Sequence, residues 1–180
     1  METTKNIDDL VNRSRKDDMT AQYELYQIYA DAMYAICKRM LVNTMDAEEI
    51  LQDAFVIAFT KINKLKHTQK FGGWLKRITI NECVDFARRK KIHFDELDEN
   101  IAFEDDDKSE VWDVDVETIM VAIAELPVGS RIIFNLHLIE NYKHNEIAEM
   151  LHISESTSKS QYRRAKHLLK EKLTNTNHER

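Results

Sequence analysis

The chain has 180 residues, with 32 acidic and 26 basic side chains and a net charge of −6. This length accommodates one ordinary domain or two small ones. Only three glycines and one proline occur, so turns are few and long helices are favoured over a many-stranded fold. The polar start METTKNIDDLVNRSRKDD and the lack of a long apolar run predict a soluble, cytoplasmic protein without a signal peptide or membrane insertion.

The excess of acid is confined to one segment. Residues 1–92 carry 16 Lys and Arg against 13 Asp and Glu, a net of +3, and residues 118–180 carry 9 against 7, a net of +2. Residues 93–117 carry 1 against 12, a net of −11. Charges act over a Debye length of about 8 Å at physiological salt. The total charge therefore does not exclude a nucleic-acid partner for either flanking segment.

Three amphipathic helices are expected in the first half. Apolar residues recur at helical spacing over residues 20–41, 47–64 and 74–91. We expect Asp46 to cap the second helix, because Glu49 follows it at capping-box spacing. The pair Gly72-Gly73 indicates a loop over residues 66–73. Three helices with one apolar face each predict a small bundle, with residues 1–92 as the first domain.

The second half is also expected to be helical. Residues 93–116 are acidic and have no sustained apolar period, which predicts a flexible linker. Periodicity resumes at residue 117, and helices are expected near 131–139, 146–151 and 155–173, with a turn at 152–154. Nothing is typical of a strand. The fold class is therefore all-α, with two small helical domains, 1–92 and 117–180, joined by an acidic linker.

Residues 143–173 have the pattern of a helix-turn-helix, in which a short helix and a tight turn precede a longer basic helix. Such a second helix enters the major groove, where arginine is the preferred partner of guanine. Ser154 is expected to cap this helix. The alternative is a solvated basic helix in a bundle. The side chains expected on its outward face are Ser156, Thr157, Lys159, Ser160, Arg163, Arg164 and Lys166.

Residues 71–91 mix aromatic and cationic side chains, among them Phe71, Trp74 and Arg88, with the polar Asn81 in mid-helix. Aromatic faces beside a basic track suit single-stranded nucleic acid, because unpaired bases stack while cations hold the backbone. The alternative is that the aromatic residues at helical spacing form a core, and Trp74 in particular could be mainly structural.

No enzymatic or metal-binding pattern stands out. The histidines are scattered without metal-ligand spacing, and no P-loop or GxSxG occurs. We therefore expect no enzyme activity, no cofactor and no metal. Cys37 and Cys83 fall in apolar helical patterns without a CxxC pair, which indicates core packing.

Two parts of the sequence, the first quoted as three stretches and the second as one, resemble a known family. The residues AQYELYQIYADAMYAICKRM, DAEEILQDAFVIAFTKI and FGGWLKRITINECVDFARRKK resemble region two of the extracytoplasmic-function (ECF) sigma factors. The residues AELPVGSRIIFNLHLIENYKHNEIAEMLHISESTSKSQYRRAKHLLKEKL resemble region four of the same family. The resemblance implies a factor that binds core RNA polymerase, through the β′ clamp helices and the β flap, and recognises promoter DNA.

The resemblance also implies roles for particular residues. Region four would contact the minus-thirty-five element through the basic helix named above, and the acidic linker would thread polymerase channels built for nucleic acid. The family often has Gly where Ser156 stands and Arg where Gln161 stands. The polar surface for the clamp helices would be Glu49, Gln52 and Asp53, and the minus-ten contacts on the melted strand would be Phe71, Trp74, Asn81, Arg88, Arg89 and Lys90.

Two other classes remain open at this point. A stand-alone helix-turn-helix transcriptional regulator would bind DNA without polymerase, usually as a dimer on a palindrome. A helical adaptor would use no DNA. An anti-sigma factor is a common partner in the resembling family, although no residue of this sequence indicates one.

Overall fold

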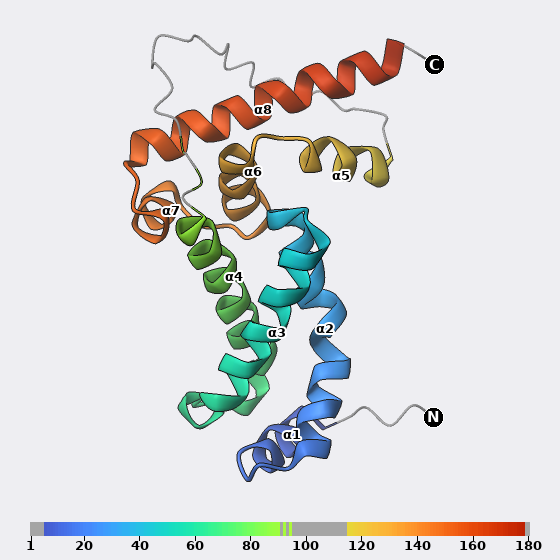
Figure 1. The fold of residues 1–180 in the computed structure, drawn as a ribbon, viewed down its shortest axis with the longest axis vertical. Coiled ribbons are helices and arrows are strands. Elements are labelled where there is room, and N and C mark those ends of the chain that lie inside the picture. Colours follow the sequence, from blue (N-terminus) through green and yellow to red (C-terminus); the bar gives the residue numbers. More distant parts are fainter. Residues whose placement is uncertain (1–5, 91, 93, 95–114, 179–180) are drawn as a thin grey trace. The chain divides into compact units, whose positions relative to one another are not determined.

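The computed structural model describes residues 6–90, 92, 94 and 115–178. All regular structure in these residues is helical, as predicted. The chain divides into two compact units, residues 1–86 and 87–180. The colours of Figure 1 follow the sequence from blue at the N-terminus to red at the C-terminus. Apart from residues 94, 115 and 116, the acidic linker expected at 93–116 lies outside the described residues.

The first unit contains the three predicted helices with shifted ends, and the last of them runs three residues past the boundary at residue 86. They are α2 (Met19–Leu41), α3 (Thr44–Thr60) and α4 (Phe71–Arg89), with short 3-10 turns η1 (Ile62–Lys64) and η2 (Thr68–Lys70) between the last two. The predicted cap of α3 was wrong by three residues. The side chain of Asn43 accepts the backbone N–H of Asp46 at 3.1 Å, because asparagine is as good an N-cap as aspartate and comes earlier.

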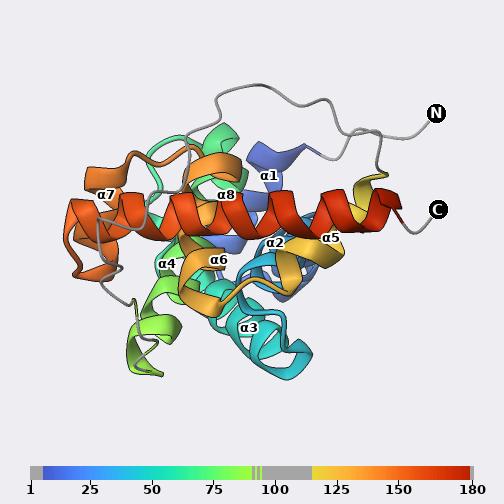
Figure 2. The ribbon, with the colours of Figure 1, turned by 90° about the horizontal axis from the view of Figure 1, so that it is seen from above.

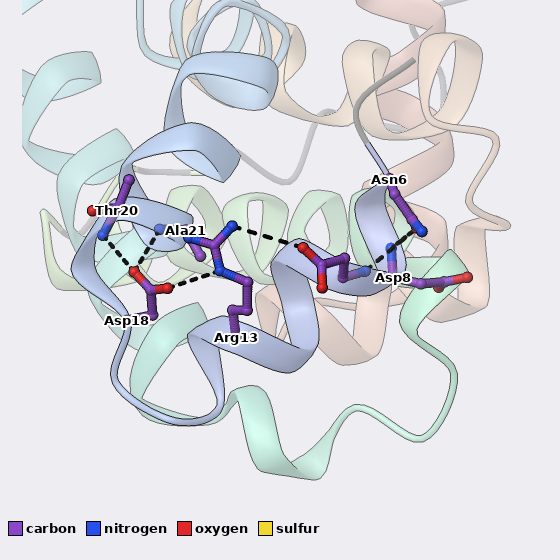
Figure 3. Close-up of polar contacts among 7 residues, drawn as sticks. Asn6, Asp8, Arg13, Asp18, Thr20 and Ala21 are labelled. Atoms are coloured by element: carbon purple, nitrogen blue, oxygen red, sulfur yellow. Dashed lines mark hydrogen bonds and ion pairs between the residues drawn. The ribbon is translucent and has the colours of Figure 1, made fainter. Parts of the chain in front are cut away.

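A fourth helix, α1 (Ile7–Ser14), precedes these three and was not predicted. Asn6 caps it by accepting the backbone N–H groups of Asp8 and Asp9, as Figure 3 shows for Asp8. Leu10 and Val11 are buried. A cap, an acidic first turn and a pair of apolar residues are the sequence signal for such a helix. The apolar pattern of this helix spans only two turns, which is too short for periodicity to indicate it.

Gly72 lies inside the first turn of α4, so the loop predicted to run through residue 73 ends at Lys70. A Cβ atom at Gly72 would meet Cε1 of Tyr29 at 2.8 Å. The glycine is therefore needed for the close approach of α4 to α2 and not for a turn. The ring of Tyr29 also packs against Phe71, with centroids 5.4 Å apart.

The core of the first unit includes both cysteines. Cys37 of α2 and Cys83 of α4 are fully buried free thiols, with their Sγ atoms 3.9 Å apart. This burial confirms the prediction that both pack in the core. Hydrogen bonding from Cys83 lowers the pKa of the Cys37 thiol, and the same pairing, with burial, raises the pKa of Cys83.

The second unit is built around one long helix. It contains α5 (Val116–Ala124), α6 (Val128–Phe134) with a following π-helical turn η3 (Asn135–Ile139), α7 (His144–Leu151) and α8 (Glu155–His178). The helices α5, α6 and α7 all pack against α8. Figures 1 and 2 show α8 as one uninterrupted helix, and its end at His178 lies beyond the predicted end. One cluster of its buried side chains comprises Ala122, Ile123, Leu126, Phe134, Ala165, Leu169 and Leu173.

The predicted helix-turn-helix is present as α7, a turn and α8. His152 ends α7 in the left-handed conformation, with φ 56° and ψ 45°. Ser154 caps α8 as predicted, because its hydroxyl accepts the backbone N–H of Thr157 at 3.0 Å. None of the described helices is long and apolar enough to cross a membrane.

Candidate nucleic-acid interface

One face of α8 carries exposed polar and basic side chains. Ser156, Lys159, Arg163 and Lys166 are all exposed and follow one another at three- and four-residue steps, which places them on one side of the helix. Arg164 is half-buried beside this stripe. A continuous exposed stripe of this kind is what a helix needs to contact the major groove.

Two side chains expected on this face point inward. Thr157 is 5% exposed and Ser160 is 9% exposed, so the prediction that they face outward was wrong. The Thr157 hydroxyl lies 2.7 Å from the hydroxyl of Ser154, and the Ser160 hydroxyl donates to the carbonyl of Thr157 at 3.1 Å. Thr157 begins the four-residue series that continues through the buried Gln161 and Ala165, and this series is the face that α8 turns to its own unit.

Lys159 is already paired within the helix. Its Nζ lies 2.6 Å from Oε1 of Glu155, and both side chains are about half exposed. The hydrogen bond and the positive charge of Lys159 lower the pKa of Glu155. A phosphate that binds Lys159 would therefore share the ammonium, which has three N–H donors, with this carboxylate.

An aromatic cluster supports the start of α8. The rings of His137 and His144 stack with centroids 4.1 Å apart, and the edge of Tyr162 packs on both. Nδ1 of His144 lies 2.9 Å from the hydroxyl of Ser158. Burial, followed by the charge effects of His137 and Lys159, lowers the pKa of His144. Histidines that are scattered in sequence thus link α7 to α8.

The described residues contain no group of three or more His, Cys, Asp or Glu that could hold a metal ion. The paired histidines are explained by their packing on Tyr162 and by their hydrogen bonds to Ser158 and to the carbonyl of Tyr142.

A pocket of about 150 Å³ opens in the first unit. Cavities of this size accommodate one six-membered aromatic ring. Two of its lining residues, Trp74 and Asn81, are predicted nucleic-acid contacts that the fold brings together. The whole lining is Ile57, Lys61, Lys64, Trp74, Ile78, Asn81 and Glu82.

Phe71 does not belong to this pocket. Its side chain is fully buried and packs against Tyr29 and against Trp74, with ring centroids 5.4 Å and 6.1 Å away. The prediction that Phe71 contacts a melted strand is therefore contradicted. The first position of α4 points into the bundle, and the aromatic one turn later lies at the pocket.

Sequence reasoning missed Lys61 and Lys64 as pocket residues. The available signal was the basic run from residue 61 to residue 70, which contains four lysines and one histidine. At the other end of α4, Arg88, Arg89 and Lys90 are exposed. Cations therefore flank the pocket residues along both the preceding loop and the end of the helix.

The exposed surface of α3 is partly apolar. Glu49 and Gln52 are exposed and Asp53 is half-buried. Met45 and Val56, at 79% and 64% exposure, extend the line of Glu49 and Gln52 at helical spacing. The predicted polar surface is thus bordered at each end by one exposed apolar side chain.

Comparisons with known proteins identify the family. Models of sigma-70 region 2 and sigma-70 region 4 match residues 25–92 and 117–169. The ECF RNA polymerase sigma factor SigW of Bacillus subtilis (strain 168) is 32% identical over 177 residues, covering 91% of this chain and 94% of SigW. SigM of the same organism, also an ECF RNA polymerase sigma factor, is 27% identical over 150 residues, covering 82% of this chain and 91% of SigM.

A solved structure shares the fold. The sigma factor RpoE, crystallised with the anti-sigma factor NepR from Bartonella quintana, superposes with a TM-score of 0.52 at 18% identity. The match covers 84% of this chain and 96% of RpoE. The helical fold and the two matched regions define a transcription initiation factor of the sigma-70 type. More narrowly, the chain belongs to the ECF RNA polymerase sigma factors, which decides against the stand-alone regulator and the adaptor.

Proposed function

We propose that the two units of this sigma factor recognise promoter DNA in different states. The first unit captures an unpaired base of the minus-ten element in the pocket lined by Trp74 and Asn81. The second unit reads the minus-thirty-five element as duplex through the exposed stripe of α8. The single observation that carries this division is the pocket, because it joins an aromatic ring, an amide and two lysines from separate segments.

Capture of a base needs help from polymerase. Stacking of an unpaired base on an aromatic side chain contributes about 1–3 kcal/mol, whereas extrusion from the duplex costs a few kcal/mol. The Asn81 amide can both donate to and accept from a base edge. Arg88, Arg89 and Lys90 are exposed and suit the neighbouring phosphates. The pocket therefore stabilises a melted state that polymerase makes accessible.

In the second unit, Arg163 occupies a position on α8 from which its guanidinium can pair with guanine. Lys159 and Lys166 suit phosphates, and Ser156 lies one turn before Lys159 on the same exposed face. Thr157 and Ser160 support the helix from inside and are not part of this contact surface.

Polymerase is proposed to bind apolar and polar side chains together. On α3, Glu49, Gln52 and Asp53 would meet the β′ clamp helices, with Met45 and Val56 at the border of the same surface. In the second unit, α5 exposes Val116, Met120 and Val121. We assign these apolar side chains of α5 to the β flap.

The remaining expectations belong to the same proposal. The factor works in the cytoplasm, without catalysis of its own and without a cofactor. Its linker, with a net charge of −11 over residues 93–117, imitates nucleic acid in the polymerase channels. An anti-sigma factor is a further partner in this proposal, since the structurally similar RpoE was crystallised in complex with the anti-sigma factor NepR.

Reconstituted transcription tests this proposal. The purified chain is added to core RNA polymerase with a library of promoter templates, and the transcripts are mapped. We expect initiation at templates that share a minus-ten and a minus-thirty-five sequence, with weak binding of the free chain to the same DNA. Tight, sequence-specific binding without polymerase would contradict the division of labour proposed here.

A further inference from the structure

The helix α1 lies before the region that matches the family model, which begins at residue 25, and it holds the loop that precedes α4. One oxygen of the Asp8 carboxylate accepts a hydrogen bond from the hydroxyl of Thr68. The other accepts from Nε2 of Gln69 at 3.2 Å. One residue past the other end of the helix, Arg15 donates from Nη2 to the carbonyl of Leu65 at 2.5 Å. Both ends of α1 thus bind residues 65–70.

The helix is itself fixed at several points (Figure 3). Asn6 caps its start. At its end, Nε of Arg13 donates to Oδ2 of Asp18 at 2.8 Å. Leu10 and Val11 are buried. A helix anchored in this way can act as a fixed support for a loop that contacts it.

The supported loop has little order of its own. Residues 61–70 form only the two short 3-10 turns η1 and η2, and fixing the backbone of each residue costs about 1–2 kcal/mol of conformational entropy. The segment presents Lys61 and Lys64 to the pocket, and Lys66, His67 and Lys70 are exposed. The contacts with α1 fix the segment at Leu65, Thr68 and Gln69, among the exposed cations of its second half.

We propose that Asp8 is a positioning residue for minus-ten recognition. By binding Thr68 and Gln69, it holds the basic loop at the mouth of the pocket in the conformation that receives the melted strand. This inference rests on the proposed function of the pocket, and it assigns to α1 a part in promoter opening. Asp8 does not touch DNA in this scheme; it acts through the loop.

Full-length variants in reconstituted holoenzyme test the proposal. Asp8→Ala removes both hydrogen bonds, and Asp9→Ala is the matched control, because it removes a neighbouring carboxylate that faces Arg13 instead. Opening is followed with a fluorescent base analogue in the minus-ten element. We expect Asp8→Ala to slow opening by about three- to tenfold, with unchanged affinity for core polymerase, while Asp9→Ala behaves as the wild type. Asp8→Asn, which keeps an acceptor for Thr68, should restore part of the rate.

A double variant separates positioning from general stability. If Asp8 acts through Thr68, then Thr68→Val should slow opening alone but add little to Asp8→Ala. Equal opening rates for Asp8→Ala and Asp9→Ala would overturn the proposal. So would a loss of core affinity and of melting temperature in proportion to the loss of opening, since a purely structural role predicts that result.

Hydrogen exchange makes the inference testable apart from the proposed function. Amides of residues 61–70 should exchange faster in Asp8→Ala than in the wild type or in Asp9→Ala. Unchanged exchange in this segment would refute the support by α1. A wild-type holoenzyme that opens no promoter would instead refute the proposed function of the pocket, and the two failures are therefore distinguishable.

Discussion

The hydroxyl of Ser130 in α6 donates a hydrogen bond to Oε1 of Gln161 in α8 over 2.5 Å. Both side chains are at most 1% exposed. A neutral, buried contact therefore joins two helices of the second unit. Buried polar groups that lose a partner are costly, so this pair contributes to the placement of α8.

Ser130→Ala should destabilise the second unit by about 1–3 kcal/mol, because the oxygen of Gln161 loses a hydrogen bond that water cannot replace in the interior. Urea unfolding followed by circular dichroism measures the change. Glu149→Ala, at an exposed position of α7, is the control and should shift stability by less than about 0.5 kcal/mol. Equal stability of the two variants would contradict the role of the buried pair.

Arg163→Ala should weaken holoenzyme binding by about 1–3 kcal/mol at its own promoters and relax the base preference at one minus-thirty-five position. Lys166→Ala is the comparison, with a uniform loss on all sequences and a lower salt dependence. Binding to a set of promoters at several salt concentrations distinguishes the two. A uniform loss for Arg163→Ala would make it a phosphate contact.

Asn81→Ala should reduce discrimination at one base of the minus-ten element by about 1 kcal/mol, as expected for one lost hydrogen bond. Duplex binding at the minus-thirty-five element should stay unchanged. Arg77→Ala serves as the control, since Arg77 is exposed on α4 but does not line the pocket. Competition between melted-strand templates gives the measurement, and equal effects of both variants would remove Asn81 from the base pocket.

Glu49→Lys should weaken binding to core polymerase by about tenfold, because reversed charge opposes the partner that this carboxylate faces. Glu48→Lys is the control, because it makes the same charge change at the preceding residue of α3. Glu48 is also exposed, but it does not lie on the line of Met45, Glu49, Gln52 and Val56. Affinities come from titration of labelled variants with core enzyme. Similar losses for both would indicate a general effect of charge.

Stability should fall in acid partly through Asp18. The side-chain hydrogen bond from Arg13, followed by that from the backbone of Ala21, lowers the pKa of Asp18 in the folded protein. A lowered folded pKa stabilises the protein above the unfolded value, about 3.9, and this contribution is lost as the pH falls through the folded pKa. The melting temperature of the wild type should therefore exceed that of Asp18→Asn at pH 6, with the difference closing below about pH 4.

Arg13→Met provides the control for the cause of this effect. It removes the hydrogen bond to Asp18 but leaves the carboxylate as the cap of α2. The acid dependence due to Asp18 should shrink in this variant. A pH profile identical to that of the wild type would show that Arg13 is not responsible.

Periodicity predicted the helices α2, α3 and α8 because each presents a long apolar stripe. Periodicity failed where one or two residues determine where a helix begins or which side chains face the core. Gly72 is typical of a turn in sequence, yet it lies in a helix that must approach Tyr29 closely. Thr157 and Ser160 are small and polar, so composition placed them outside, whereas the phase of the helix places them inside.

The pocket could not have been predicted from local patterns. Trp74 and Asn81 share one helix, but Lys61 and Lys64 come from the preceding connection, and only the packed bundle brings the four together. The support of the loop by Asp8 depends on contacts across sixty residues of sequence. Such contacts follow from tertiary structure, which no single segment of the chain specifies.

The ion pair between Lys159 and Glu155 has a consequence for DNA binding. The carboxylate is an internal competitor for the cation that a DNA phosphate would bind. In the proposed contact a phosphate would share the Lys159 ammonium with Glu155, so the nearby negative charge offsets part of the attraction between Lys159 and DNA. Because such an exposed pair contributes at most about 1 kcal/mol, Glu155 would weaken the proposed contact of Lys159 with any duplex slightly and independently of its sequence.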